Sequence, residues 1–100
     1  MKIEIAAQGF AAMGSESRMD VLQTLVRAGD KGLPVGEIQK RTGIAASTLA
    51  HHIKFLSAAG LIEQEKQGRT IINQANYEHL RNLAAYILEE CCIDEEGSDQ

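Results

Sequence analysis

The fold of this chain is decided by one stretch, residues 34–73, with the sequence PVGEIQKRTGIAASTLAHHIKFLSAAGLIEQEKQGRTIIN. Its first ten residues predict a short helix. Pro34 suits the first helical position, where the missing N–H would have no partner in any case, and Ile38 supplies the main apolar anchor. Gly43 follows where a helix needs a residue at positive φ in order to end. We therefore expect a short helix followed by a tight glycine turn.

A second helix is predicted directly after this turn. Three apolar residues fall at the i, i+4 and i+7 spacing of one buried stripe: Leu49, Ile53 and Leu56. The other side, near the start of this helix, carries small or polar residues: Ala46, Ser47, Thr48 and His51. A short helix, a glycine turn and a second helix of this kind form the helix-turn-helix pattern.

Two short strands are predicted next, over residues 62–66 and 70–73, joined across Gln67, Gly68 and Arg69. A hairpin in this place is a wing. The stretch as a whole therefore predicts a winged helix-turn-helix, mainly α-helical with one small β-hairpin, of the kind that binds DNA.

Two helices are predicted before this stretch. Residues 2–13 have a broad apolar side, and Gly14 ends that helix. Ser15 is a candidate N-cap for the next helix, which Gly29 terminates. Residues 30–33 are predicted to form a connecting loop.

A last helix is predicted after the hairpin, from Tyr77 to about Cys92, with Asn76 as a candidate N-cap. It has a wide apolar face made of Leu80, Leu83, Ala84, Ile87 and Leu88. The chain is therefore expected to hold one domain, residues 1–93, of four helices, a hairpin and a fifth helix. The acidic residues 94–100 are predicted to be disordered.

The first and last helices carry more apolar surface than a winged core can bury. Burial against a second copy of the chain would use this surplus, so we predict a homodimer through the terminal helices. Such a dimer places two recognition helices about one DNA turn apart, which suits an inverted-repeat operator in double-stranded DNA.

The net charge of −4 is unusual for a DNA-binding protein, but the charge is unevenly distributed. Residues 31–72 hold six basic and three acidic residues, a local charge of +3, and the remainder holds four basic and eleven acidic residues, a charge of −7. The local field is what acts on phosphates. The sequence has no apolar run of membrane length and no secretory signal, which predicts a cytoplasmic protein without a membrane partner. It also has no motif that predicts an enzyme.

The order of these segments resembles the ArsR/SmtB family of bacterial metal- and metalloid-responsive repressors over roughly residues 10–92. The most specific part is TLAHHIKFLSAAGLIEQEKQGR, residues 48–69. The resemblance implies a homodimeric repressor that binds DNA without a cofactor and leaves its operator when an inducer binds. By this resemblance, bases are met by Ala46, Ser47, Thr48, Ala50 and His51, and phosphates by Lys40, Lys54, Lys66 and Arg69.

The two adjacent histidines are predicted to differ. His51 faces outward, where it can donate to a guanine acceptor. His52 lies toward the inner edge of the helix and is interpreted as a structural, hydrogen-bonded residue. Ala46 stands where a glutamine is common in the family, so a strong adenine reader is missing and no base preference is predicted.

The resemblance offers three places for an inducer. The first place is a cysteine pair in the helix of residues 35–42. This pair is absent here, because Val35, Gly36 and Glu37 occupy that position. The second place is a zinc site on the last helix, where only His79 matches a ligand position of the family. One histidine cannot form a tetrahedral zinc site, so His79 is interpreted as a surface or interface residue. The third place, at the end of the last helix, matches Cys91 and Cys92.

Cys91 and Cys92 are therefore candidate ligands for a thiophilic inducer, As(III) or Sb(III), because thiolates select soft species. No third cysteine follows, so a third ligand must come from the partner subunit, a small thiol or a non-sulfur group. The neighbouring glutamates and the helix dipole disfavour thiolates, which argues against a peroxide sensor. The residues leave open a redox or persulfide sensor that uses these thiols, a structural role for Cys91, and an interaction module that binds protein or RNA.

Overall fold

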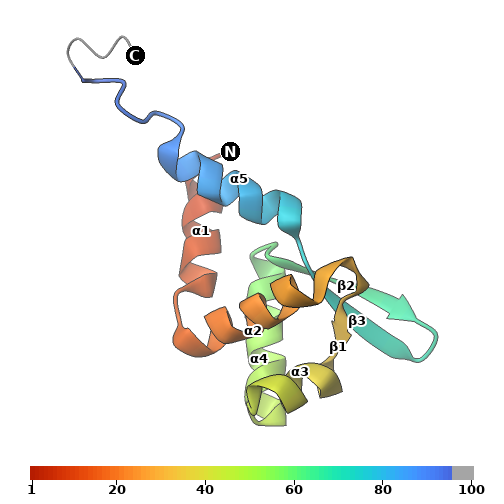
Figure 1. The fold of residues 1–100 in the computed structure, drawn as a ribbon. Helices are drawn as coiled ribbons and strands as arrows, with labels where there is room; N and C mark the ends of the chain where they lie inside the picture. The colour runs from red at the N-terminus through yellow and green to blue at the C-terminus, as the bar shows by residue number, and fades with distance from the viewer. Residues whose placement is uncertain (96–100) are drawn as a thin grey trace.

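The computed structural model describes residues 1–95, which form helices around a small sheet (Figure 1). The predicted winged helix-turn-helix fold is confirmed. Residues 96–100 of the predicted acidic tail lie outside the described residues. Within residues 1–95, every helix is too short or too polar to span a membrane. The elements follow in the order α1 (Ile3–Met13), α2 (Glu16–Ala28), the 3-10 turn η1 (Gly29–Lys31), β1 (Leu33–Pro34), α3 (Val35–Thr42), α4 (Ala46–Ala58), β2 (Ile62–Gln67), β3 (Thr70–Ala75) and α5 (Tyr77–Leu88).

Local sequence signals set most helix ends. The Ser15 hydroxyl caps α2 by accepting a hydrogen bond from a first-turn N–H at 3.2 Å, and the Asn76 side chain caps α5 in the same way at 3.1 Å. Gly43 ends α3 in the left-handed conformation, with φ 73°. Pro34 departs from its prediction: it is the N-cap of α3 and not its first helical residue, because its extended backbone (ψ 160°) also pairs in the sheet.

The loop predicted at residues 30–33 contains a short strand that sequence reasoning missed. β1 pairs with β3 in antiparallel fashion, Leu33 opposite Asn73, and the strand order is β1-β3-β2. Gly32 lies directly before β1 at φ 66°, and a Cβ there would be 2.5 Å from the Asn73 carbonyl oxygen. A two-residue strand is too short to show an alternating pattern, so only the tertiary pairing reveals it.

The hairpin is longer than predicted, by one residue in β2 and two in β3. Gln67 pairs with Thr70, which leaves a two-residue loop. At the base of the hairpin, the Asn73 side chain is buried. Its Nδ2 donates to the Leu33 carbonyl oxygen at 3.2 Å, and its Oδ1 accepts from Gln64 Nε2 at 2.9 Å. This one amide therefore ties all three strands together.

The aliphatic core lies mainly between α2, α3, α4 and the sheet, and it continues into the terminal helices through Ala6, Ala12 and Leu83. The predicted stripe of α4 is confirmed, since Leu49, Ile53 and Leu56 are all buried, and Ile38 of α3 packs with them. Val21 of α2 is fully buried as well, which the sequence did not single out. Burial of each such side chain stabilises the fold by about 1.5–3 kcal/mol relative to exposure.

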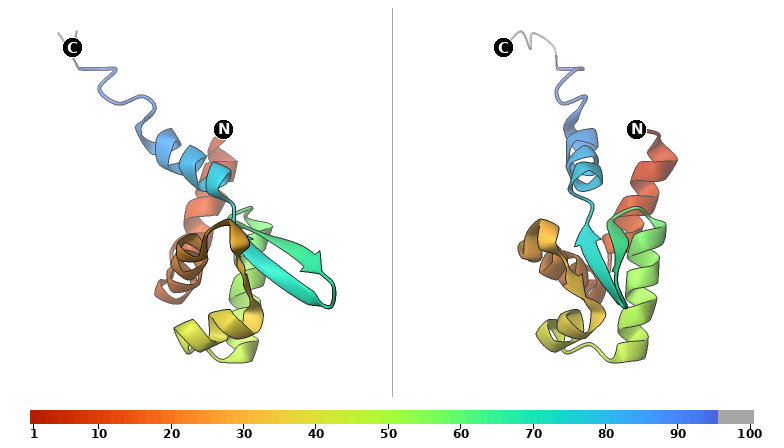
Figure 2. Two further views of the ribbon diagram at one scale, coloured as in Figure 1. Left: turned by 45° about the vertical axis from the view of Figure 1, so that its right-hand side comes forward. Right: turned by 90° about the vertical axis from the view of Figure 1, so that its right-hand side faces the viewer.

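The terminal helices α1 and α5 lie at one end of the molecule, away from α3 and the tip of the hairpin (Figures 1 and 2). They approach closely at Gly9, where an added Cβ would lie 2.9 Å from Leu83 Cδ1. Within one chain, the wide apolar face predicted for the last helix is fully buried only at Leu83. Large apolar side chains stay exposed on both helices, at Ile3, Ile5, Ile87 and Leu88, and Met1 before α1 is exposed as well.

The last helix ends earlier than predicted. α5 stops at Leu88, and the backbone then runs through successive turns, with Cys92 at φ 65°. The prediction that the helix reaches about Cys92 is therefore wrong. Two features account for this: Glu89 and Glu90 are unfavourable at the negative end of a helix, and the residues after Leu88 are exposed and gain no packing.

Candidate nucleic-acid interface

The N-terminal half of α4 presents small and polar side chains to the outside. Because Leu49 and Ile53 are buried on the inner side, they fix the rotation of α4 about its axis. The N-cap, Ala45, supplies no side-chain hydrogen bond, so the first N–H groups of α4 are left to other acceptors, of which a phosphate is one. The residues predicted to meet bases are all exposed: Ala46, Ser47, Thr48, Ala50 and His51.

The four cations predicted to contact phosphates come from three elements. Side chains alternate across a strand, so Lys66 shares its face of β2 with Gln64, whereas Glu63 and Glu65 occupy the other face. The two carboxylates are thereby kept off the face that carries the lysine. All four cations are exposed: Lys40 on α3, Lys54 on α4, Lys66 on β2 and Arg69 in the hairpin loop.

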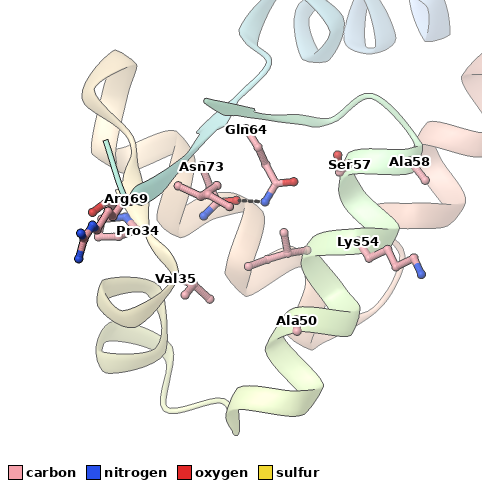
Figure 3. A pocket seen from close by; sticks show the side chains of 12 residues that line it. Pro34, Val35, Ala50, Lys54, Ser57, Ala58, Gln64, Arg69 and Asn73 are labelled. Atoms are coloured by element: carbon pink, nitrogen blue, oxygen red, sulfur yellow. Dashed lines mark hydrogen bonds between the residues drawn. The ribbon is translucent and has the colours of Figure 1, made fainter. Parts of the chain in front are cut away.

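A groove of about 710 Å³ separates α4 from the hairpin (Figure 3). Val35 of α3, Ile53 of α4 and Ile71 of β3 give it apolar walls, while Lys54 and Arg69 are its charged lining residues. Ala50 also lines it. The groove therefore adjoins the surface predicted to meet DNA.

The two histidines of α4 occupy different environments. His51 is exposed and meets the Phe55 ring edge-on, with 5.3 Å between ring centroids and 69° between ring planes. His52 is half-buried on the inner side, as predicted, but within residues 1–95 its buried Nδ1 has no hydrogen-bond partner, which contradicts the hydrogen-bonded interpretation at that atom. Burial lowers the pKa of His52, and the positive charge of Arg18 and then His51 add to this effect.

Arg18 joins three helices, a role that sequence reasoning missed. Its Nε donates to the Ala12 carbonyl oxygen and its Nη2 to that of Ala11, which closes the end of α1. Its guanidinium lies 4.9 Å from the centroid of the Phe55 ring of α4, in a cation–π contact. No local sequence pattern marks this arrangement.

The two cysteines lie beyond α5 and are exposed, with their Sγ atoms 3.1 Å apart. Hydrogen bonding with Cys91 raises the pKa of the Cys92 thiol, and Glu95 adds to the rise. Among residues 1–95, no group of three or more His, Cys, Asp or Glu side chains is placed to hold a metal ion. The fold of a single chain therefore brings together two sulfur ligands and no third. His79 is half-buried in α5, beside a hollow between α1 and α5.

Comparison with known proteins decides the family. A family model described as a helix-turn-helix domain matches residues 13–65, more than half of the chain. The chain is 39% identical over 67 residues to an HTH-type transcriptional regulator of Bacillus subtilis, YceK, and the match covers 67% of this chain and 66% of YceK. The structure resembles an ArsR-like transcriptional regulator from Rhodococcus, with a TM-score of 0.79 and 28% identity over 92% of this chain and 83% of that one. The chain belongs to the ArsR family.

A further relative of this ArsR-family chain is the transcriptional activator HlyU of Vibrio cholerae. It is 33% identical over 60 residues, 60% of this chain and 53% of HlyU. The structure of reduced HlyU superposes with a TM-score of 0.68 at 25% identity, over 89% of this chain and 90% of that one. The matched residues thus span about two thirds of YceK and about half of HlyU.

Proposed function

We propose that this ArsR-family protein is a cytoplasmic, homodimeric transcriptional repressor. It binds an inverted-repeat operator without a cofactor and leaves it when As(III) or Sb(III) binds Cys91 and Cys92. The observation that supports DNA binding is the exposed start of α4, with its small and polar side chains, together with a hairpin that carries exposed cations. The observation that supports sensing is the close pair of exposed thiols.

The proposed contacts divide into two groups. The hydroxyls of Ser47 and Thr48 can donate to or accept from base edges, His51 can donate to guanine, and the methyl groups of Ala46 and Ala50 can meet the thymine methyl. Phosphate contacts position the protein on the duplex but carry no sequence information. They are assigned to Lys40, Lys54, Lys66 and Arg69, the exposed cations of α3, α4 and the hairpin.

Dimerisation is proposed through α1 and α5. The exposed fraction is 68% for Ile3, 63% for Ile87 and 66% for Leu88. Apolar side chains gathered on one surface of a small protein mark an interaction site. A two-fold dimer through these helices would leave both copies of α4 free at the other end of the molecule (Figure 1).

The proposed inducer chemistry conserves protons. When arsenous acid binds a thiol, an S–As bond replaces the S–H and As–O bonds, and the thiol proton leaves with the hydroxide as water. A raised thiol pKa therefore does not prevent binding, whereas it would slow attack on a peroxide, which requires thiolate. Two sulfurs come from Cys91 and Cys92, and the third position is filled by a remaining hydroxide, a small thiol or a group of the partner subunit.

A redox or persulfide sensor that uses the same thiols is the second candidate. Consecutive Cα atoms are only about 3.8 Å apart, closer than a disulfide normally allows, so a bond between Cys91 and Cys92 would be strained in turns as well as on a helix. Oxidation would therefore join these exposed thiols to the partner subunit or to a small thiol. The relative HlyU has a known structure in its reduced form, which suggests this alternative. An oxidant, or sulfide together with an oxidant that accepts the two electrons released on persulfide formation, would then release the protein from DNA where arsenite does not.

The test uses a DNA site selected by the protein from random duplexes. Fluorescence anisotropy should show arsenite weakening the binding of the wild-type protein by about 100-fold, a coupling free energy of about 2.7 kcal/mol. The double variant Cys91→Ser, Cys92→Ser should bind DNA as tightly as wild type and be insensitive to arsenite. Release of this variant by arsenite would refute the site. Selection of no two-fold symmetric sequence would refute the operator.

A further inference from the structure

Two exposed apolar residues are explained neither by the core nor by the terminal helices. Val35, at the start of α3, is 48% exposed, and Ile71, on β3, is 51% exposed. Both line the groove between α4 and the hairpin. Ile53 of α4, which is buried, lines it as well. A concave apolar surface that faces solvent is typical of a binding site for a ligand with an apolar part.

The polar groups of the deep wall are already paired. Gln64 donates to Asn73 across the strands at 2.9 Å (Figure 3), and Asn73 donates in turn to the Leu33 carbonyl oxygen. The groove therefore does not need a polar occupant to satisfy these amides. The second N–H of the Gln64 amide can still orient an acceptor.

The charged lining of the groove has one sign. Lys54 of α4 and Arg69 of the hairpin loop both belong to the lining, and the Lys54 side chain points away from the hairpin (Figure 3). Among the described residues that line the groove, none is an aspartate or a glutamate. The charged lining residues are therefore both cations, and they favour a ligand that carries a negative charge.

We propose that this groove binds a small organic anion, with an apolar body and a carboxylate, phosphate or sulfonate at one end. A volume of about 710 Å³ falls within the range of small-molecule sites. A sugar–phosphate backbone would place polar atoms on the apolar walls. A second copy of the chain would use the terminal helices, which lie at the other end of the molecule (Figure 2).

Binding of such an anion competes with DNA. Lys54 and Arg69 are cations of the groove and also proposed phosphate contacts, so one anion neutralises charge that the duplex requires. This consequence rests on the proposed function, whereas the ligand site itself does not. The groove would then give the repressor an input separate from the thiols beyond α5.

The test titrates the full chain with decanoate and with decylammonium, each followed through the backbone amide signals in NMR. Decanoate should shift the amides of Ser57, Gln64 and Ile71. Decylammonium has the same length and the opposite charge. It should bind about tenfold more weakly, because its positive head group is repelled by Lys54 and Arg69, whereas the carboxylate of decanoate is attracted.

Position 35 offers a matched pair of variants. Val35→Asp should weaken decanoate binding by about tenfold, while Val35→Lys should retain it. An acidic residue suits the first turn of α3, so Val35→Asp should fold. If decanoate shifts only amides of α1 and α5, or if the two variants bind it equally, the proposal is overturned.

Measuring DNA binding in the presence of decanoate distinguishes the proposed ligand site from the proposed DNA-binding function. At a decanoate concentration near the wild-type dissociation constant, decanoate should weaken DNA binding by the wild-type protein more than by Val35→Asp. Decanoate that binds in the groove and leaves DNA affinity unchanged would overturn the competition. A protein that binds no DNA at all would refute the proposed function, and the amide shifts would still decide the ligand site.

Discussion

The winged region, residues 15–75, and the terminal helices bury their large apolar side chains to different extents. Leu25 and Leu49 of the winged region have no exposed surface, whereas Ile3 of α1 is 68% exposed and Leu88 of α5 is 66% exposed. The radius of gyration, 16.1 Å, also exceeds the value of about 13 Å for a compact chain of this length. The comparison shows a winged body that is complete in one chain and a helical end that is not.

The two regions are nevertheless joined by specific hydrogen bonds. The Tyr77 hydroxyl at the start of α5 donates to the Val26 carbonyl oxygen of α2 at 3.1 Å. Next to it, Asn76 Nδ2 donates to the Gly60 carbonyl oxygen, directly before β2, at 3.1 Å. A movement of α5 in a dimer would therefore act on α2 and on the turn that leads into the hairpin.

The largest difference between the regions is expected in stability. Leu49→Ala should lower the free energy of unfolding by about 2–5 kcal/mol, because it leaves a cavity in a closed core. Leu88→Ala should change it by less than about 0.5 kcal/mol in dilute, monomeric protein, because the side chain is mostly exposed. Urea unfolding followed by circular dichroism measures both. Equal losses would mean that Leu88 is packed as closely as Leu49.

Breaking the proposed dimer should give the next largest effect. The double variant Ile87→Glu, Leu88→Glu should be monomeric in analytical ultracentrifugation. It should bind a two-fold symmetric site about 100-fold more weakly, about 2.7 kcal/mol, because the second half-site contact is no longer intramolecular. Val26→Glu, at an exposed position of α2, is the control and should stay dimeric. A monomeric variant with undiminished affinity would contradict the two-half-site mode.

The close approach of α1 and α5 can be tested with two glycines. Gly9→Ala should destabilise the protein by about 1–3 kcal/mol, because the new methyl group meets the fully buried Leu83. Gly36→Ala, within α3 where nothing lies within 4 Å of an added Cβ, should stabilise it by about 0.5–1 kcal/mol. Thermal unfolding of both variants gives the comparison. If both substitutions stabilise, α1 and α5 are farther apart than described.

The smallest effect is expected at His52. In the folded protein the pKa of His52 is lowered from its ordinary value of 6.5. As the pH falls below 6.5, His52 therefore takes up a proton in the unfolded chain before it does so in the folded chain, which favours unfolding. The stability contributed by neutral His52 is therefore present above pH 6.5 and lost as the pH falls through the folded-state pKa. Urea midpoints at about pH 5.5 and about pH 7.5 should differ less in His52→Gln than in wild type. An unchanged difference would show that other groups cause the pH dependence.

Sequence reasoning located the elements whose signals are local. The caps at Ser15 and Asn76, the left-handed Gly43 and the buried stripe of α4 depend on residues within two turns of one another, so their patterns are visible in the sequence. β1 was missed because Leu33 pairs with Asn73, forty residues away. The role of Arg18 was missed for the same reason, since its aromatic partner lies on another helix.

The sequence by itself determined the winged helix-turn-helix, the exposed start of α4 and the presence of two neighbouring thiols. Only the tertiary structure decided that α5 stops at Leu88, that Cys91 and Cys92 lie in turns beyond it, and that a groove opens beside α4. Helical periodicity and capping arise from contacts between near neighbours, which sequence records directly. A helix end without supporting packing, and a cavity between distant elements, depend on the whole arrangement of the chain in space.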